Sequence, residues 1–224
     1  MDDAMPSNGD ARSPAMARLS DAELRELKQG LVAAVVGAGV DDAALSVLIR
    51  QLTTDPDALK PVVQLSLNDP SRLAALNSTG LMAGGAGRTL DTVALLAAEA
   101  LATPFVAISL LDDSTELLAG LNVDDGDCER VRSADLSIGK FTVATGIPFI
   151  VDDAKDHPLL AGHPTVLSGA VGAYAGIPIF SDDDDAVGSM CAWDTHAVNW
   201  TGGQILVLQD MADLASAKIF RRPI

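Results

Sequence analysis

The sequence predicts an α+β protein with a central antiparallel sheet of five to six strands, flanked by helices and preceded by short amphipathic helices. Apolar, β-branched segments occur in two pairs, residues 104–111 with 116–121 and residues 172–180 with 186–194, each joined by a short polar turn. Apolar residues follow helical spacing instead at 90–101 and again near the C-terminus. The long crossovers of a parallel sheet are missing, so hairpins dominate and the strands should run antiparallel.

The charge of the chain excludes several kinds of partner. Its 224 residues include 31 acidic and 15 basic side chains, which gives a net charge of −16. Such a field repels phosphate groups, so we expect no direct binding to nucleic acid or to a membrane surface. The N-terminus lacks the features of a signal peptide, and the longest apolar run, residues 31–40, is too short to cross a bilayer. We therefore expect a cytoplasmic protein.

Three regions follow one another along the chain. Residues 1–18 are rich in Ser, Pro, Ala, Asp and Gly without periodicity, and we expect a disordered tail. Residues 19–68 are expected to form an N-terminal helical region, since Ser20 and Glu23 make a capping box and amphipathic segments follow. Residues 69–224 then form the main domain with its linker helix and C-terminal helix, beginning at an Asp-Pro helix-start signal.

Two sequence stretches in this main domain are distinctive. Residues 174–179 read Tyr-Ala-Gly-Ile-Pro-Ile, and residues 187–194 read Val-Gly-Ser-Met-Cys-Ala-Trp-Asp. They resemble the paired strands of GAF domains of the bacterial sensor type, which carry Tyr-Ala-Gly-x-Pro and Gly-x-x-Cys-x-x-Asp patterns. Residues 148–154 resemble the family's middle strand, and residues 69–76 resemble its linker segment. The resemblance implies a GAF-like fold from about residue 69 to residue 220.

The sequence also departs from the family's pattern at three places. Gly139 stands where the family often has a Cys at the start of its short helix, here expected at 138–144. Glu116, Leu117 and Leu118 stand where a Trp-Phe pair is usual, and Ala173 replaces a common Phe. These changes reshape the family's pocket, so no ligand is carried over from the resemblance.

The cysteines argue against catalysis. Some GAF proteins reduce free methionine sulfoxide, which requires an attacking thiolate and a resolving thiol. Cys191 is predicted to lie in the middle of a strand, where a buried small hydrophobe is usual. Cys128 follows Asp127 and precedes Glu129, and neighbouring acids raise the pKa of a thiol. We therefore predict a protein that is not an enzyme and has no catalytic residues.

The cysteines, histidines and acids indicate which cofactors and metals the protein could hold. Covalent bilin attachment needs a suitable Cys, commonly followed by His, and no Cys-His pair exists, so no bilin is expected. Haem held by His163 is the weaker alternative, because a loop histidine is more often solvated or hydrogen-bonded. The acidic run at 182–185 lacks the spacing of a calcium loop and is expected to be a solvated turn, so we predict no metal site.

A small-molecule pocket remains the favoured site. In the GAF fold it would lie on the sheet face opposite the terminal helices, beneath the 138–144 helix and the 152–169 loop. The candidate lining residues are Phe141, Asp153, His163 and Tyr174.

The last helix supplies the second candidate surface. It opens with a T-x-x-Q capping box at Thr201 and carries an apolar stripe expected to face a second copy. The stripe consists of Ile205, Leu208, Ala212, Ala215 and Ile219. The sequence thus predicts a non-catalytic regulatory module that binds a small molecule, forms a homodimer, or does both, to signal to a partner protein. We expect it to bind neither nucleic acid nor a membrane. The alternatives are a ligandless dimerisation scaffold and, less favoured, a GAF-type methionine sulfoxide reductase.

Overall fold

The computed structural model describes residues 19–37, 39, 42–83, 88–123 and 129–220. The expected disordered tail at 1–18 lies outside these residues, as does Cys128. Within the described residues, no helix is both long and apolar enough to cross a membrane.

One antiparallel sheet forms the centre of the described part of the chain, as the sequence predicts. Its strands lie in the order β3-β2-β1-β6-β5-β4. They are β1 (Phe105–Leu111), β2 (Thr115–Leu121), β3 (Val131–Ser133), β4 (Phe149–Val151), β5 (Ala173–Phe180) and β6 (Ala186–Asp194). The hairpins β1–β2 and β5–β6 are those predicted, and β1 joins them by pairing with β6. The short strand β3 lies outside the strand segments that the sequence predicts.

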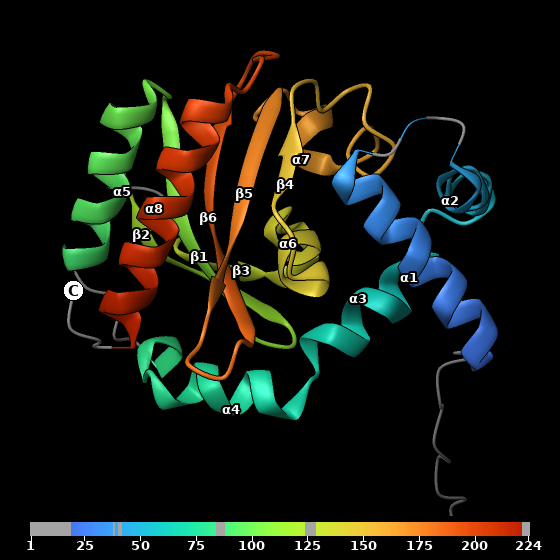
Figure 1. The fold of residues 1–224 in the computed structure, drawn as a ribbon, viewed down its shortest axis with the longest axis horizontal. Coiled ribbons are helices and arrows are strands. Elements are labelled where there is room, and N and C mark those ends of the chain that lie inside the picture. The colour runs from blue at the N-terminus through green and yellow to red at the C-terminus, as the bar shows by residue number, and fades with distance from the viewer. Residues whose placement is uncertain (1–18, 38, 40–41, 84–87, 124–128, 221–224) are drawn as a thin grey trace, which may run out of the picture.

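Helices cover both faces of the sheet (Figure 1). On one face, α5 (Arg88–Leu101) and α8 (Gly202–Ile219) pack together and on the strands. On the other face, α6 (Gly139–Thr145) packs over β1, β5 and β6, and α7 (Pro164–Leu167) follows in the loop after β4. The predicted capping box at Thr201 opens α8, where the Thr201 hydroxyl accepts from the backbone N–H of Gln204. The helices α5 and α8 therefore lie on the sheet face opposite α6, as the sequence predicts.

Four N-terminal α-helices precede α5 in the described part of the chain. They are α1 (Asp21–Val36), α2 (Ala43–Thr54), α3 (Lys60–Leu67) and α4 (Pro70–Ser78). The capping box of Ser20 and Glu23 opens α1, as predicted. Helices α1 and α3 contact α6, α1 also contacts β4, and α2 packs on α1 (Figure 1). The buried leucines and valines of α1, α2 and α3 join Phe141, Phe149 and Val151 in one hydrophobic cluster on the α6 side, whereas Leu76 of α4 belongs to the cluster of α5 and α8.

A buried arginine connects these helices to the sheet through hydrogen bonds. Arg72 in α4 is almost fully buried, and its guanidinium donates hydrogen bonds to the carbonyl oxygens of Leu67 and Leu111. These two carbonyls belong to the last residues of α3 and β1. Burial lowers the pKa of Arg72, and Asp112 and Asp69 nearby act in the opposite direction. One cation thus joins the end of α3 to the end of β1.

Candidate functional site

The structure brings three of the four predicted pocket residues to the α6 face. Phe141, His163 and Tyr174 are buried there, in α6, at the N-cap of α7 and in β5 respectively. Asp153 does not join them: its side chain is exposed and accepts a hydrogen bond from the backbone N–H of Lys155 at 2.9 Å. It shapes the turn after β4 and is not placed among the buried lining residues.

Aromatic rings fill much of the space beside α6. The ring of Phe149 lies 6.0 Å from that of Phe141, 5.9 Å from that of Tyr174 and 5.1 Å from that of His157, measured between centroids. His157 also lies 3.1 Å from the carbonyl oxygen of Ala34, through Nε2. The α6 face is therefore packed with rings and connected directly to α1.

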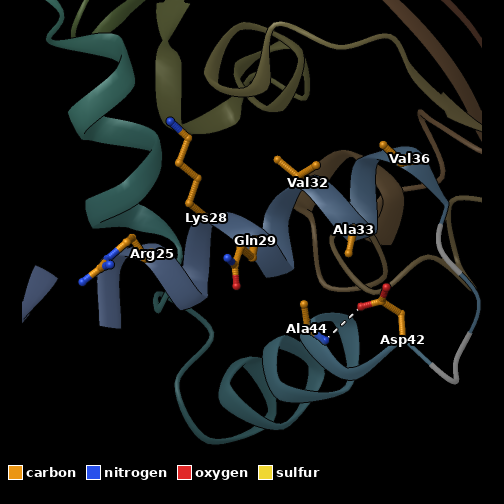
Figure 2. A pocket seen from close by; sticks show the side chains of 8 residues that line it. All are labelled: Arg25, Lys28, Gln29, Val32, Ala33, Val36, Asp42 and Ala44. Carbon is orange, nitrogen blue, oxygen red and sulfur yellow. Dashed lines mark hydrogen bonds between the residues drawn. The ribbon is translucent and has the colours of Figure 1, made fainter. Parts of the chain in front are cut away.

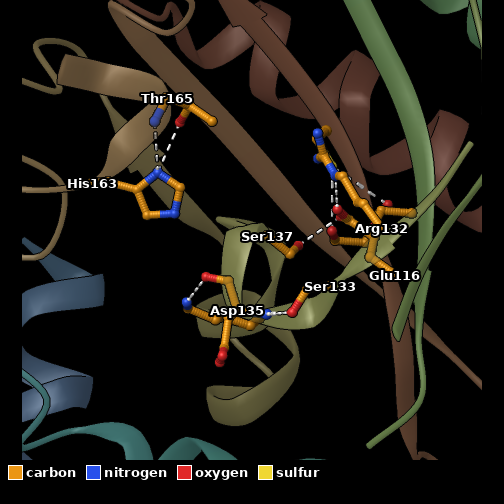
Figure 3. Close-up of polar contacts among 11 residues, drawn as sticks. Glu116, Arg132, Ser133, Asp135, Ser137, His163 and Thr165 are labelled. Atoms are coloured by element: carbon orange, nitrogen blue, oxygen red, sulfur yellow. Dashed lines mark hydrogen bonds and ion pairs between the residues drawn. The ribbon is translucent and has the colours of Figure 1, made fainter. Parts of the chain in front are cut away.

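A buried carboxylate organises the polar part of this face. Glu116 in β2 is 1% exposed. Its Oε1 accepts from the hydroxyls of Ser109 and Ser137, the latter at 2.6 Å, and its Oε2 accepts from Nε of Arg132 (Figure 3). A buried carboxylate is tolerated when donors and an opposite charge surround it, and Glu116 has both.

Three buried polar atoms near this carboxylate have no hydrogen-bond partner. They are Oγ1 of Thr142, Nε2 of His163 and the hydroxyl oxygen of Tyr174. The Tyr174 hydroxyl lies beside Cys191 and Ser189 but in good hydrogen-bond geometry with neither. Buried polar groups are almost always hydrogen-bonded in folded proteins, so three such atoms on one face are unusual.

The bonding of the His163 ring fixes which nitrogen carries its proton. The backbone N–H of Thr165 donates to Nδ1 at 3.3 Å, and the hydroxyl of Thr165 lies 2.8 Å from the same atom. An accepting Nδ1 leaves the proton of the neutral ring on Nε2. Figure 3 shows the Nε2 edge of the ring directed toward the side of Ser137 and Glu116. His163 therefore presents an unused N–H donor toward the polar cluster.

Burial favours the neutral form of four titratable side chains at this site. It lowers the pKa of His163 to about 4, with Lys140 and Arg132 adding to the effect. It likewise lowers the pKa of Lys140 and raises the pKa of Tyr174 well above its usual value. The pKa of the Cys191 thiol is raised to about 11, again mainly by burial. At neutral pH the imidazole, the phenol and the thiol are all neutral.

Two glycines let α6 lie close to the sheet. A Cβ atom placed on Gly139 would lie 2.6 Å from Oγ of Ser189, and one on Gly176 would lie 2.7 Å from the Tyr174 hydroxyl and 2.8 Å from Oγ1 of Thr142. The family's common Cys at position 139 would not fit this packing. The same contacts leave no slot for a flat porphyrin between α6 and the sheet, so the residues present do not fit haem.

Sequence reasoning missed the residues around Glu116. The sequence pattern marks Glu116 only as a departure from an aromatic pair, and it does not distinguish Ser109, Ser137 or Thr142. The available signal was a charged residue inside a strand that is otherwise apolar, with six of its seven residues buried. A charge at such a position is rare unless partners surround it.

The apolar stripe of α8 is used inside the chain. Leu208, Ala212, Ala215 and Ile219 are buried in one cluster with α5 and the inner strands, and Ile205 packs against it. Four of the five predicted interface side chains are therefore buried within the chain, whereas Ile205 is partly exposed, and the predicted dimer through this stripe stays a prediction. The large apolar side chains that α5 and α8 leave exposed, among the described residues, are Leu95, Leu96 and Leu206.

Comparisons with known proteins agree with this fold. The GAF domain family model matches residues 86–219. The type II free methionine-R-sulfoxide reductase of Thermoplasma acidophilum is 12% identical, with a TM-score of 0.50 over 62% of this chain and 95% of that one. The GAF domain of Acinetobacter phosphoenolpyruvate-protein phosphotransferase is 13% identical, with a TM-score of 0.50 over 67% of this chain and 94% of that one.

A further similar structure is the free methionine-R-sulfoxide reductase of Neisseria meningitidis, 19% identical, with a TM-score of 0.48 over 64% of this chain and 84% of that one. No protein of curated function matches the sequence. At these identities the solved structures share the fold alone. The family match covers more than half of the chain, and the six described strands with helices on both faces agree with it: the chain belongs to the GAF domain family.

Proposed function

We propose that this protein is a non-catalytic regulatory GAF protein that binds a small polar molecule beneath α6 and signals to a partner protein. The observation that carries the proposal is the group of three buried, unpartnered atoms in Thr142, His163 and Tyr174. Each buried polar group left without a hydrogen bond costs about 1–3 kcal/mol. A ligand that bonds to all three would recover this cost on binding.

The chemistry of the three atoms describes the ligand. Nε2 of His163 offers a donor, whereas the hydroxyls of Thr142 and Tyr174 can donate or accept. The ligand would therefore carry at least one acceptor oxygen and further polar atoms within a few ångströms. Because α6 lies close to the sheet, we propose that α6 moves outward when the ligand enters, and that α1 and α3, which contact α6, carry the change onward.

The test begins with native mass spectrometry of the purified full chain, followed by a thermal-shift screen of small polar metabolites. Tyr174→Phe and Thr142→Val should each weaken binding of the best ligand about tenfold, the loss of one hydrogen bond. Ser216→Ala is the matched control, since Ser216 is a buried hydroxyl on the other face, bonded to the carbonyl oxygen of Phe180. Equal loss in all three variants, or no ligand at all, would contradict the proposal.

A ligandless scaffold is the second candidate. It is favoured by the close approach of Gly139 and Gly176 and by the rings packed around Phe149. The two candidates differ in the metabolite screen. In a scaffold, no metabolite should stabilise the protein, and Tyr174→Phe should raise the free energy of unfolding equally with and without metabolites.

The absence of catalysis is part of the proposal. Two of the similar solved structures are free methionine-R-sulfoxide reductases, and the proposal assigns no such activity to this chain. It is supported by the Cys191 thiol, which is buried and whose raised pKa of about 11 leaves little thiolate at neutral pH. The test is reduction of free methionine sulfoxide with a thiol reductant. Turnover that disappears in Cys128→Ser or Cys191→Ser would overturn this part.

A further inference from the structure

The first two helices form an arm that stands out from the rest of the molecule (Figure 1). Helix α2 packs mainly on α1, whereas α1 also packs on α3, α6 and β4. The α1–α2 crossing is tight: a Cβ atom on Gly30 would lie 2.8 Å from Cβ of Leu48. Leu27 and Leu31 of α1 are buried in the core on its inner side. The arm is thus held to the body mainly through α1.

The outward side of α1 and the start of α2 line an open groove of about 680 Å³. Figure 2 shows two adjacent rows along α1, one with Lys28, Val32 and Val36 and the other with Arg25, Gln29 and Ala33. Each row repeats every four residues, so both follow one side of the helix. The groove extends over three turns, about 17 Å at 1.5 Å per residue.

The groove is apolar at one end and basic at the other. Val36 is 62% exposed, and Val32 and Ala33 continue the apolar surface beside it. Arg25 and Lys28 make the other end basic, in a chain with a net charge of −16. Nε of Arg25 donates to the carbonyl oxygen of Asp21, which leaves the positive charge of the guanidinium in place. Asp42 lies at the α2 side, where it caps α2 by accepting from the N–H groups of Ala44 and Leu45.

We infer that this groove docks an amphipathic helix of a partner protein, about three turns long, with acidic residues at the end that meets Arg25 and Lys28. An apolar helix face fits Val32, Ala33 and Val36, as in other helix-in-groove interactions. Acidic residues complement the basic end, and they are favourable in the first turn of any helix.

The position of the groove would allow a bound partner helix to influence the packing of α6. Helix α1 presents the groove on one side and contacts α6 and β4 on the other. A partner helix bound to α1 therefore lies one helix away from the proposed ligand site. The inference itself stands without that ligand, because the groove is present in the protein as described.

The test is a selection from a displayed library of 14-residue helical peptides against the purified full chain, with Val36→Asp as the counter-selection target. Selected peptides should share apolar residues at helical spacing and two or more acids at one end.

The fluorescein-labelled consensus peptide is then titrated by fluorescence anisotropy. We expect its Kd to rise at least tenfold in Val36→Asp and to stay unchanged in Leu65→Asp. Leu65 is a matched control, 66% exposed on α3 and outside the groove.

The charge is tested separately with Arg25→Glu and Lys28→Glu combined. This variant should bind the consensus peptide at least tenfold more weakly and should prefer a version in which its acids are replaced by lysines. The inference is overturned if no peptide distinguishes wild type from Val36→Asp, or if the acids prove unnecessary. It is also overturned if sedimentation shows a dimer that Val36→Asp dissociates, since a second copy would then fill the groove.

Discussion

His163 and Glu116 illustrate two ways in which a buried polar side chain can be accommodated. Glu116 keeps a full set of donors, from Ser109, Ser137 and Arg132. His163 has one nitrogen bonded at the N-cap of α7 and one buried without a partner. The carboxylate is thus stabilised by its neighbours, whereas the imidazole is stabilised only in its neutral form.

This difference predicts a pH dependence of stability. The pKa of His163 is about 4 in the folded protein and about 6.5 in the unfolded chain. The unfolded chain therefore binds more protons between these values, and stability falls as the pH decreases from about 6.5 to about 4. Below pH 4 the loss from this residue is complete, at about 3 kcal/mol.

The measurement compares wild type with His163→Asn by urea unfolding at pH 7.5 and pH 4.5. Asn retains a side-chain acceptor for the N-cap of α7 but does not titrate. We expect the pH-dependent loss to be smaller in His163→Asn by roughly 2–3 kcal/mol. The comparison cancels His157, whose pKa burial also lowers, and the carboxylates common to both proteins. Identical pH profiles would show that His163 is not held neutral.

At the scale of elements, the packing of α6 on the sheet depends on Gly139. An added methyl group would meet Oγ of Ser189, so Gly139→Ala should destabilise the fold by about 1–3 kcal/mol. Removing that oxygen in Ser189→Ala should restore most of the loss, which a double-mutant cycle measures. Gly120→Ala is the control: its Cβ would meet the backbone oxygen of Leu90, so Ser189→Ala should give no rescue. Rescue of both variants would contradict this account.

The packing of the apolar stripe of α8 against α5 and the sheet gives a second prediction at the scale of elements. Leu208→Asp places a charge in the core shared with α5, so it should cost about 4 kcal/mol or more and lower the urea midpoint. Leu206→Asp, at a side chain that is 63% exposed, should change stability by less than about 0.5 kcal/mol. If Leu208→Asp instead released folded monomers from a dimer in sedimentation, the stripe would serve an interface after all. The predicted homodimer stays a prediction until this measurement is made.

Most elements of the fold could be predicted from the sequence, because each has a local cause. Capping residues begin α1 and α8, Asp69 and Pro70 begin α4, and polar turns join the hairpins. What the sequence could not supply is the identity of the surface that covers an apolar stripe. The stripe of α8 has the same periodicity whether it faces its own sheet or a second chain.

The candidate site was predictable only in part for a related reason. Tyr174, His163 and Phe141 could be placed through the family resemblance. The cluster around Glu116 joins β1, β2, β3 and the segment before α6, which come together only in the folded chain. No local pattern links Ser109 to Ser137.

At the scale of the whole molecule, two hydrophobic clusters lie on opposite sides of the sheet. One contains residues of α4, α5 and α8, and the other contains residues of α6, β4 and the helices α1, α2 and α3. Since the second cluster includes leucines and valines from α1, α2 and α3, the N-terminal helices should stabilise the domain and not simply precede it.

A fragment comprising residues 69–224 tests this cooperation. It should be less stable than the full chain by roughly 3 kcal/mol or more, since each buried Leu or Val contributes ~1.5–3 kcal/mol. It should also bind more of the dye ANS, because the outer side of α6 and β4 would be uncovered. Urea unfolding of both proteins measures the difference. Equal free energies of unfolding would indicate that residues 19–68 form an independent domain.

The bond between His157 and the carbonyl of Ala34 joins residues 123 positions apart in the chain. Translation adds about 5–20 residues per second, so α1 leaves the ribosome about 6–25 s before the strand and loop that cover it. During that time Leu27 and Leu31 have only the neighbouring helices against which to pack. We expect the nascent N-terminus to be a chaperone client, with α1 becoming protease-resistant only in arrested chains long enough to expose residue 160.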